Sequence, residues 1–312
     1  MEYRDTIGVD KNERFGVELE FSDVRLAKVK KEGETKGLPI KYIYKHYNRP
    51  LPFNTWYLDE DTTVTEEIFG QPGIKRLVGG ELSSRILKDT PDDWREIRKI
   101  CEFLKSLKAK TNTYCSSHIT VNISSLDNPN ELLRTLSQVV AVYEPELHYF
   151  YMGDKYERRA LMDEYASLIR PRVFTEERSY IESLPDSKQR IPLIYTSMDA
   201  IRVKKGLFRG PQLLEFRYPN GTLNAKTIQN NINFTLKLIE AIANGNFNGY
   251  RLNHEIRKAL HEVDYSRLNQ SALETTEARD DYFDELVETI TREDADKEAF
   301  YRQFQKVKST KI

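Results

Sequence analysis

The chain has 312 residues, enough for one large domain or two of ordinary size. Its 48 basic and 49 acidic side chains give a net charge of −1, so no global basic field argues for a nucleic-acid partner. No apolar run approaches the roughly 20 residues of a membrane helix, and the polar first residues carry no secretory signal. We therefore expect no membrane partner, and two cysteines with neither a disulfide framework nor a zinc spacing indicate a reducing, cytoplasmic setting. Cys101 and Cys115 are expected in the core.

The first predicted strand, residues 14–22, has one apolar and one acidic face. Side chains two positions apart in a strand share a face, with Cα atoms roughly 6.5 Å apart. Glu18 and Glu20 therefore lie together, and Val17 and Leu19 point the other way. Two neighbouring carboxylates favour a hard divalent cation such as Mg²⁺ between them. The alternative is the solvated outer face of a half-buried strand.

The next segments predict two strands and a helix. Residues 56–63 predict a strand that ends in an acidic turn containing Asp61. Residues 76–87 predict another strand, in which the pair Gly79-Gly80 marks a bulge or a close backbone approach just before Glu81. Residues 90–107 follow the helical period, with Thr90 as the N-cap and a proline at the first helical position.

The middle of the chain contains a strictly alternating strand. In residues 116–124, His118, Thr120 and Asn122 share one face and aliphatic side chains occupy the other. A helix is predicted over 129–150, and strands are predicted over 193–204 and 212–218. The last strand carries Glu215 and Arg217 on one face, where the two side chains could form a plain salt bridge. The arginine-rich stretch 153–190 has no clear period.

The C-terminal part of the chain is predicted to be helical. A long amphipathic helix covers 225–244 and ends at Gly245, and residues 251–312 are charged with a helical pattern. We expect this extension to pack on the preceding domain, residues 1–250, or on a second copy, which would make a homo-oligomer. Its apolar anchors are Tyr265, Leu268, Tyr282, Phe283, Leu286, Ile290, Phe300, Tyr301 and Phe304.

These elements together predict an α+β fold. The sheet is expected to be curved and mainly antiparallel, with helices on one face and a polar concave surface on the other. Carboxylates from several strands would then meet on one sheet face, where their mutual repulsion is best relieved by one or two bound cations.

Five motifs, taken in order, resemble those of the amidoligases, which are similar to glutamine synthetase and glutamate–cysteine ligase. They are FGVELEF, the Asp61-Thr62-Thr63 turn, GGELSS, the His118–Asn122 strand and LLEFRYPNGTL. The resemblance runs from about residue 14 to 245. Two positions depart from the family pattern: Thr120 stands where a second histidine is usual, and Arg85 follows Ser84 where a proline is usual.

The resemblance implies an ATP-dependent carboxylate–amine ligase with a glutamine-synthetase-like fold, which forms an amide through an acyl phosphate. Its cofactors would be ATP and Mg²⁺ or Mn²⁺, and its substrates a small-molecule, peptide or protein carboxylate and amine. The implied metal ligands are Glu18, Glu20, Glu81 and Glu215; the nucleotide contacts are His118, Asn122 and Arg217; and the catalytic residues are Asp61 and Arg217. Further phosphate or substrate contacts are expected among Arg158, Arg159, Arg170 and Arg172.

Two other functions compete with the ligase. A two-metal phosphodiesterase or nuclease also uses clustered carboxylates, but no lysine follows a strand acid by two residues and the charge balance does not favour nucleic acid. A catalytically inactive relative, kept as a binding or assembly module, is suggested by Thr120 and by the charged extension.

Overall fold

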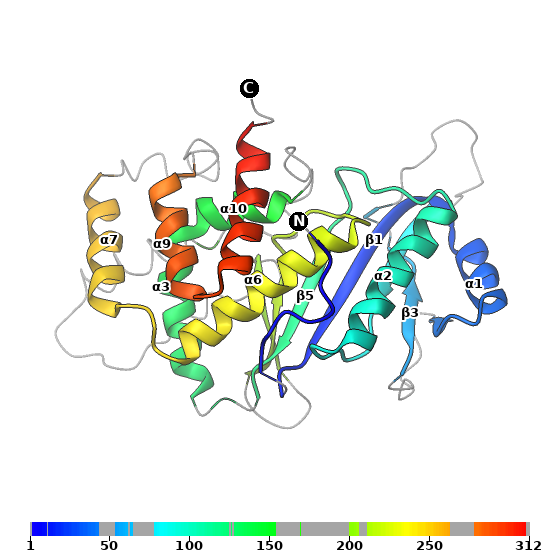
Figure 1. Ribbon diagram of the computed structural model, residues 1–312, viewed down its shortest axis with the longest axis horizontal. Coiled ribbons are helices and arrows are strands. Elements are labelled where there is room, and N and C mark those ends of the chain that lie inside the picture. The colour runs from blue at the N-terminus through cyan, green and yellow to red at the C-terminus, as the bar shows by residue number, and fades with distance from the viewer. Residues whose placement is uncertain are drawn as a thin grey trace.

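The computed structural model describes most of the chain. The described residues are 2–10, 12–43, 54–61, 63–64, 78–124, 126, 128–153, 169, 200–205, 211–262 and 278–309. The described residues form a mixed α+β structure in which helices cover a sheet (Figure 1). The predicted α+β class is therefore confirmed, and the curvature of the sheet and its glutamine-synthetase-like form stay predictions. None of the helices in these ranges combines the length and apolar character of a membrane span.

A seven-stranded sheet runs in the order β2-β3-β4-β1-β5-β7-β6. The strands are β1 (Phe15–Arg25), β2 (Ile40–Tyr42), β3 (Trp56–Asp59), β4 (Val78–Ser83), β5 (Ser117–Asn122), β6 (Ile201–Lys205) and β7 (Pro211–Phe216). Only β2 and β3 are parallel, and all other neighbours are antiparallel, as predicted. The strand predicted over 193–204 begins at Ile201, and residues 193–199 lie outside the described ranges.

The described helices are α1 (Leu26–Thr35), α2 (Pro91–Ser106), α3 (Pro129–Met152), α6 (Ala225–Ala243), α7 (Gly249–Glu262), α9 (Asp280–Ile290) and α10 (Asp294–Ser309). Helices α2, α3 and α6 begin at or within one residue of their predicted starts, whereas α1 was not predicted from the sequence. The Thr90 side chain accepts a hydrogen bond from the Asp93 N–H at the start of α2. Asn128 does the same for the Glu131 N–H at the start of α3. Each cap satisfies one of the free N–H groups that a helix leaves in its first turn.

Strand β1 divides the sheet into an apolar and a polar face. Val17, Leu19 and Phe21 are at most 1% exposed and belong to the hydrophobic core. In Figure 1 the helices α2 and α6 cross in front of β1 and β5, so they cover one face of the sheet. The alternate positions, which include Glu18 and Glu20, point to the opposite face. The alternation in the sequence thus sets which side chains reach the polar face.

Two adjacent glycines allow β4 to lie close against its neighbours. Gly79 has a positive φ of 144°, and a Cβ at this position would lie 2.7 Å from the Phe21 carbonyl oxygen. A Cβ on Gly80 would lie 2.6 Å from the Asp59 carbonyl oxygen. Both distances are far below van der Waals contact, so only glycine fits. The close approach predicted for this pair is confirmed, and it brings Glu81 next to β1.

The C-terminal helices share the hydrophobic core with the rest of the described chain. In Figure 1, α9 and α10 lie beside α3 and α6. The rings of Phe283 and Phe304 stack with centroids 3.8 Å apart, and Phe150 stacks on Phe234 with centroids 4.1 Å apart. Tyr265 and Leu268 lie outside the described residues. The division at residue 250 and the association of two copies stay predictions.

Candidate active site

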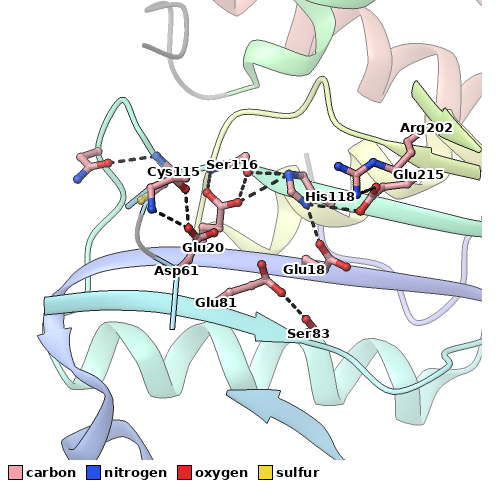
Figure 2. Close-up of polar contacts among 12 residues, drawn as sticks. Glu18, Glu20, Asp61, Glu81, Ser83, Cys115, Ser116, His118, Arg202 and Glu215 are labelled. Carbon is pink, nitrogen blue, oxygen red and sulfur yellow. Dashed lines mark hydrogen bonds and ion pairs between the residues drawn. The ribbon is translucent and has the colours of Figure 1, made fainter. Parts of the chain in front are cut away.

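A cavity of about 210 Å³ opens on the polar face of the sheet. Most of its lining side chains come from the five neighbouring strands β4, β1, β5, β7 and β6 or from the residues that flank them (Figure 2). The lining residues are Glu18, Glu20, Asp61, Thr63, Glu81, Tyr114, Ser116, His118, Arg202, Lys204, Glu215 and Arg217. Acidic and basic side chains therefore meet in one small space.

The strand register brings the acidic residues together. Glu20 of β1 lies directly opposite Glu81 of β4, and Glu18 lies opposite His118 of β5. Glu215 of β7 lies opposite Thr120, which is the next residue after His118 on the same face of β5. Because directly opposed side chains on one face have Cβ atoms roughly 5 Å apart, residues distant in the sequence become neighbours. The predicted convergence of the four glutamates on one sheet face is what this register produces.

One group of three potential ligands consists of Glu18, His118 and Glu215. His118 Nδ1 lies 2.7 Å from Glu18 Oε2 and 3.7 Å from Glu215 Oε1. One ligand atom from each residue lies within 4.8 Å of the others, so a single ion could contact all three. We call this group site A. It offers two carboxylates and one imidazole nitrogen, a set that suits Mn²⁺ as well as Mg²⁺.

A second group consists of Glu20, Asp61 and Glu81, again with one ligand atom each within 4.8 Å of the others. We call it site B. Its donors are carboxylate oxygens alone, the ligands that Mg²⁺ prefers. The Ser116 N–H donates to Glu20 Oε2 at 2.6 Å, and the Ser83 hydroxyl donates to Glu81 Oε1 at 2.5 Å. These hydrogen bonds fix two of the three carboxylates in place.

Ser116 connects the two groups. Its hydroxyl donates to Glu20 Oε1 in site B and lies 2.9 Å from His118 Nε2 in site A. Figure 2 shows this serine between the glutamate and the imidazole. The same histidine is held on its other nitrogen by Glu18, so the ring orientation is set from both sides. Such supporting hydrogen bonds orient ligand side chains and tune their basicity. Ser116 was not among the predicted site residues, although this serine precedes His118 by two positions.

Two basic residues of β6 reach site A, and sequence reasoning missed both. Lys204 Nζ lies 2.8 Å from Glu215 Oε1 and 3.7 Å from Glu18 Oε1. Arg202 Nη1 lies 3.3 Å from Glu215 Oε2. The signal was present in the alternation Ile201-Arg202-Val203-Lys204, which places both cations on one face. Basic residues on a strand are also common as solvated edge positions, so the pattern alone did not single them out.

The pKa values of the side chains that line the cavity show which carboxylates have their charge compensated by neighbouring groups. For Glu18, burial opposes ionisation, but the hydrogen bond and charge of His118, with help from Lys204, outweigh it and lower the pKa to about 2. For Glu81, burial and the charge of Glu18 raise the pKa to about 7. Burial opposes the charge on His118, yet the bond to Glu18 and the nearby glutamates raise its pKa overall. The charges are thus compensated mainly at site A.

The donor set fits divalent cations. Glu215 is 1% exposed, and its Oε2 accepts no hydrogen bond in the described structure. A buried carboxylate oxygen without a donor is costly unless a cation neutralises it. Arg202 supplies a charge at 3.3 Å but no hydrogen bond to that oxygen. The residues at hand therefore suit one cation at site A and another at site B.

The predicted site residues do not all reach this cavity. Asn122 lies at the end of β5, where its side-chain oxygen accepts a hydrogen bond from the Ser124 N–H, and it is not among the described residues that line the cavity. Asp61 lines the cavity and accepts hydrogen bonds from the Thr63 N–H at 2.8 Å and the Thr63 hydroxyl at 2.6 Å. The predicted contacts Arg158, Arg159, Arg170 and Arg172 lie outside the described residues.

Comparison with known sequences decides the family. The family described as "Putative amidoligase enzyme" matches residues 11–239, which is most of the chain. The chain belongs to the amidoligase family. The resemblance noted in the five sequence motifs is thus confirmed, and the match includes every acidic, basic and imidazole residue named above in sites A and B.

Among solved structures, this amidoligase is similar to a chain in the crystal structure of the complex between the prokaryotic ubiquitin-like protein Pup and its ligase PafA. The two chains are 9% identical, with a TM-score of 0.41. The similarity covers 98% of this amidoligase and 65% of that chain, so this chain spans about two thirds of the length of its structural neighbour. The curated proteins contain no significant match.

Proposed function

We propose that this amidoligase is an ATP-dependent ligase that joins a carboxylate to an amine. The observation that supports it is the convergence of five acidic side chains, a histidine and three basic side chains on one cavity of the sheet. Phosphoryl transfer needs little covalent help but much charge neutralisation and positioning. Rigid strands supply that positioning better than loops do. The proposed substrates are a carboxylate and an amine of a small molecule, a peptide or a protein, and the proposed location is the cytoplasm.

The cofactors are assigned to the two groups of ligands. Glu18, His118 and Glu215 would hold one divalent cation, and Glu20, Asp61 and Glu81 would hold another. When bound, Mg²⁺ or Mn²⁺ neutralises charge on the phosphate oxygens of ATP and makes the γ-phosphorus more electrophilic. His118 is the proposed nucleotide contact inside the cavity, and Asn122, on the same face of β5 but outside the cavity lining, would contact only a part of the nucleotide that extends beyond it.

The reaction proceeds in two displacements. A carboxylate oxygen of the first substrate attacks the γ-phosphorus of ATP, the bond from that phosphorus to the bridging oxygen breaks, and an acyl phosphate and ADP form. The amine nitrogen of the second substrate then attacks the acyl carbon, the carbon–oxygen bond to phosphate breaks, and inorganic phosphate leaves. Asp61, at the cavity wall, is the proposed acceptor of the proton that the attacking amine releases.

Arg217 is the proposed phosphate contact. It follows β7, is 8% exposed, and lines the cavity together with Glu215. Its backbone N–H donates to the Ala200 carbonyl at 2.7 Å, which fixes the start of the side chain. A guanidinium offers two parallel N–H donors to a phosphate, and such bidentate pairs strengthen as charge develops on the phosphoryl oxygens.

Hydroxylamine tests the proposal without knowledge of the natural amine. The full chain is incubated with ATP, Mg²⁺, hydroxylamine and a panel of amino acids and short acidic peptides, and hydroxamate and phosphate are measured. A ligase yields both products in equal amounts, because hydroxylamine traps the acyl phosphate. Glu215→Gln should abolish both products, whereas the control Glu34→Gln, an exposed change on α1, should leave them unchanged.

Two further measurements would support the competing functions. Hydrolysis of bis(p-nitrophenyl) phosphate without ATP, sensitive to Glu215→Gln, supports the two-metal phosphodiesterase. A chain whose melting temperature does not respond to ATP with Mg²⁺, and which forms no hydroxamate, supports the inactive relative. For ¹⁸O-labelled carboxylates that react, transfer of ¹⁸O to the released phosphate establishes the acyl phosphate, and its absence contradicts that intermediate.

A further inference from the structure

The Lys204 ammonium lies beside the carboxylates that site A would use for a cation. It is 2.8 Å from Glu215 Oε1 and 3.7 Å from Glu18 Oε1. His118 Nδ1 lies 3.7 Å from the same Glu215 oxygen and 2.7 Å from Glu18 Oε2. The lysine therefore supplies one positive charge to the two carboxylates that a divalent ion at site A would bind.

Site B has a different charge environment. Among the described residues, the ion pair recorded at site B joins His118 Nε2 to Glu20 Oε1 at 3.7 Å, and Arg217 adds a more distant positive charge beside Glu20. Glu20 and Glu81 face each other directly across β1 and β4. Like charges in such a pair repel, and their repulsion is relieved by a cation between them. Within the described residues the two sites thus differ: a lysine ammonium lies 2.8 Å from a carboxylate oxygen of site A, whereas the ion pair recorded at site B is the longer one between His118 and Glu20.

The side chain of Lys204 is able to leave. It comes from β6, which lies at the end of the sheet order, and it is 34% exposed. A lysine ammonium is a point charge on a flexible four-carbon stem, so it can move without any change in the strand. A divalent ion and an ammonium cannot share the same carboxylate oxygens at contact distance, because like charges repel strongly in a partly buried site.

We propose that Lys204 is the built-in counter-ion of site A and sets the order in which cations bind. This inference rests on the proposed function. Site B binds the first divalent cation, and site A binds one only when Lys204 releases Glu215. The released ammonium stays at the cavity wall, where it is available to an anionic substrate group such as the phosphates of ATP. The second cation therefore enters most readily together with the nucleotide.

Titration with Mn²⁺ alone, without ATP or substrates, tests this order. Electron paramagnetic resonance of free Mn²⁺, or calorimetry, gives the number of bound ions and each dissociation constant for the full chain. The wild type should bind a first ion and, at least tenfold more weakly, a second. Lys204→Met should tighten the second dissociation constant at least tenfold, which corresponds to about 1.4 kcal/mol, and leave the first unchanged.

Three further variants separate charge from structure. Lys204→Arg keeps the positive charge and should titrate like the wild type. Lys204→Gln is neutral but polar and should behave like Lys204→Met, which covers the case in which the methionine variant folds poorly. Lys41→Met, on the exposed side of β2, is the matched control and should change neither constant.

A purely structural lysine gives another result. Lys204→Met and Lys204→Gln would then lower the melting temperature, Mn²⁺ would not restore it, and the second dissociation constant would equal that of the wild type. Equal titrations of wild type and both neutral variants, with or without a second ion, overturn the inference. The ligase proposal is judged separately by hydroxamate formation, so a chain can pass one test and fail the other.

Discussion

Glu20 and Glu81 lie directly opposite each other in the antiparallel register of β1 and β4. They belong to the same potential cation site, together with Asp61. Two opposed carboxylates without a cation destabilise a sheet by roughly 0.2–1 kcal/mol, and burial increases the cost. Burial and the neighbouring charges of Glu18 and Glu20 raise the pKa of Glu81 to about 7. The fold therefore holds a repulsive pair at the place where the proposed chemistry needs a cation.

Glu81→Gln should remove this repulsion and the first cation site together. The expected result without metal is a melting temperature equal to or above that of the wild type. The expected affinity for the first Mn²⁺ falls at least tenfold, about 1.4 kcal/mol, because one of three carboxylate ligands is lost. Differential scanning calorimetry and Mn²⁺ titration measure the two effects. Glu34→Gln on α1 serves as the control, and a clear loss of metal-free stability in Glu81→Gln contradicts the repulsion.

Alternation in the sequence is enough to predict which side chains share the polar face, but not how their charges are compensated. Glu18 and Glu20 were expected to repel each other as a pair. The structure instead gives Glu18 a hydrogen bond from His118 and a nearby Lys204, so its pKa falls to about 2. The repulsion is concentrated at Glu81. This distribution of pKa values depends on the register between strands whose paired residues are about 60 to 100 positions apart, which no local pattern specifies.

The residues that sequence reasoning missed have ordinary local patterns. Arg202 and Lys204 alternate with apolar residues as on many edge strands, and Ser116 stands in a run of two serines. Their importance comes from the residues they contact. Arg202 and Lys204 both pair with Glu215, and Ser116 lies between Glu20 and His118. Asn122 is the opposite case. It occupies the expected position in the motif, but its side-chain oxygen accepts a hydrogen bond from the Ser124 N–H and the residue does not line the cavity.

Ser116→Ala should uncouple the two cation sites. The serine hydroxyl donates to Glu20 and lies 2.9 Å from His118 Nε2, so its loss frees both side chains. We expect each Mn²⁺ dissociation constant to weaken roughly tenfold, because supporting hydrogen bonds of ligands carry effects of this size. Calorimetric titration measures it. Ser106→Ala, at the end of α2, is the control, and unchanged constants in Ser116→Ala would show that the serine does not position the ligands.

Cys101 should make the protein less stable in alkaline solution. The thiol is 1% exposed, and burial raises its pKa from 9.0 to about 12, with a partial offset from Lys105. A group whose pKa is raised in the folded state contributes stability below its unfolded pKa and loses it as the pH rises towards its folded pKa. The contribution is therefore present below pH 9 and declines between about pH 9 and 12.

Urea unfolding at pH 8, 9, 10 and 11 measures this decline. The free energy of unfolding of the wild type should fall relative to that of Cys101→Ala by up to about 1.4 kcal/mol for each pH unit above 9. The difference between the two proteins cancels the titration of tyrosines, which both share. A difference that stays constant over this range is inconsistent with a buried, neutral thiol.

Phe283→Ala tests whether the C-terminal helices fold together with the sheet. The ring is fully buried and stacks on Phe304, and removal of such a ring costs about 3–5 kcal/mol. The two tryptophans of the chain, Trp56 and Trp94, lie at the sheet and in α2, so their fluorescence reports unfolding far from α9. If the helices share one cooperative core, the tryptophan-detected midpoint in urea falls markedly. Tyr250→Ala, at a side chain 92% exposed, is the control, and an unchanged midpoint favours a separately folding extension.

Arg217→Lys distinguishes a phosphate contact from a structural ion pair. Arg217 lines the cavity, is 8% exposed, and has its pKa lowered by burial and by Arg202. Lysine keeps the charge but loses the planar fork that binds two phosphate oxygens at once. If Arg217 contacts the phosphoryl group as it leaves ATP, turnover in the hydroxamate assay should fall at least about tenfold, or ~1.4 kcal/mol of transition-state stabilisation. Nucleotide binding, followed by the shift in melting temperature with ATP and Mg²⁺, should weaken less.

A structural ion pair predicts the opposite pattern for the same variant. The melting temperature without ligand would fall while turnover stays near that of the wild type, because an ion pair between two buried side chains stabilises the folded protein and is not specific to the transition state. Arg98→Lys is the matched control, since this arginine of α2 forms an exposed ion pair with Glu102 far from the cavity. It should leave turnover unchanged. Equal turnover of Arg217→Lys and Arg98→Lys would remove Arg217 from the phosphate site and leave the transferring phosphoryl group to the cations and to Arg202.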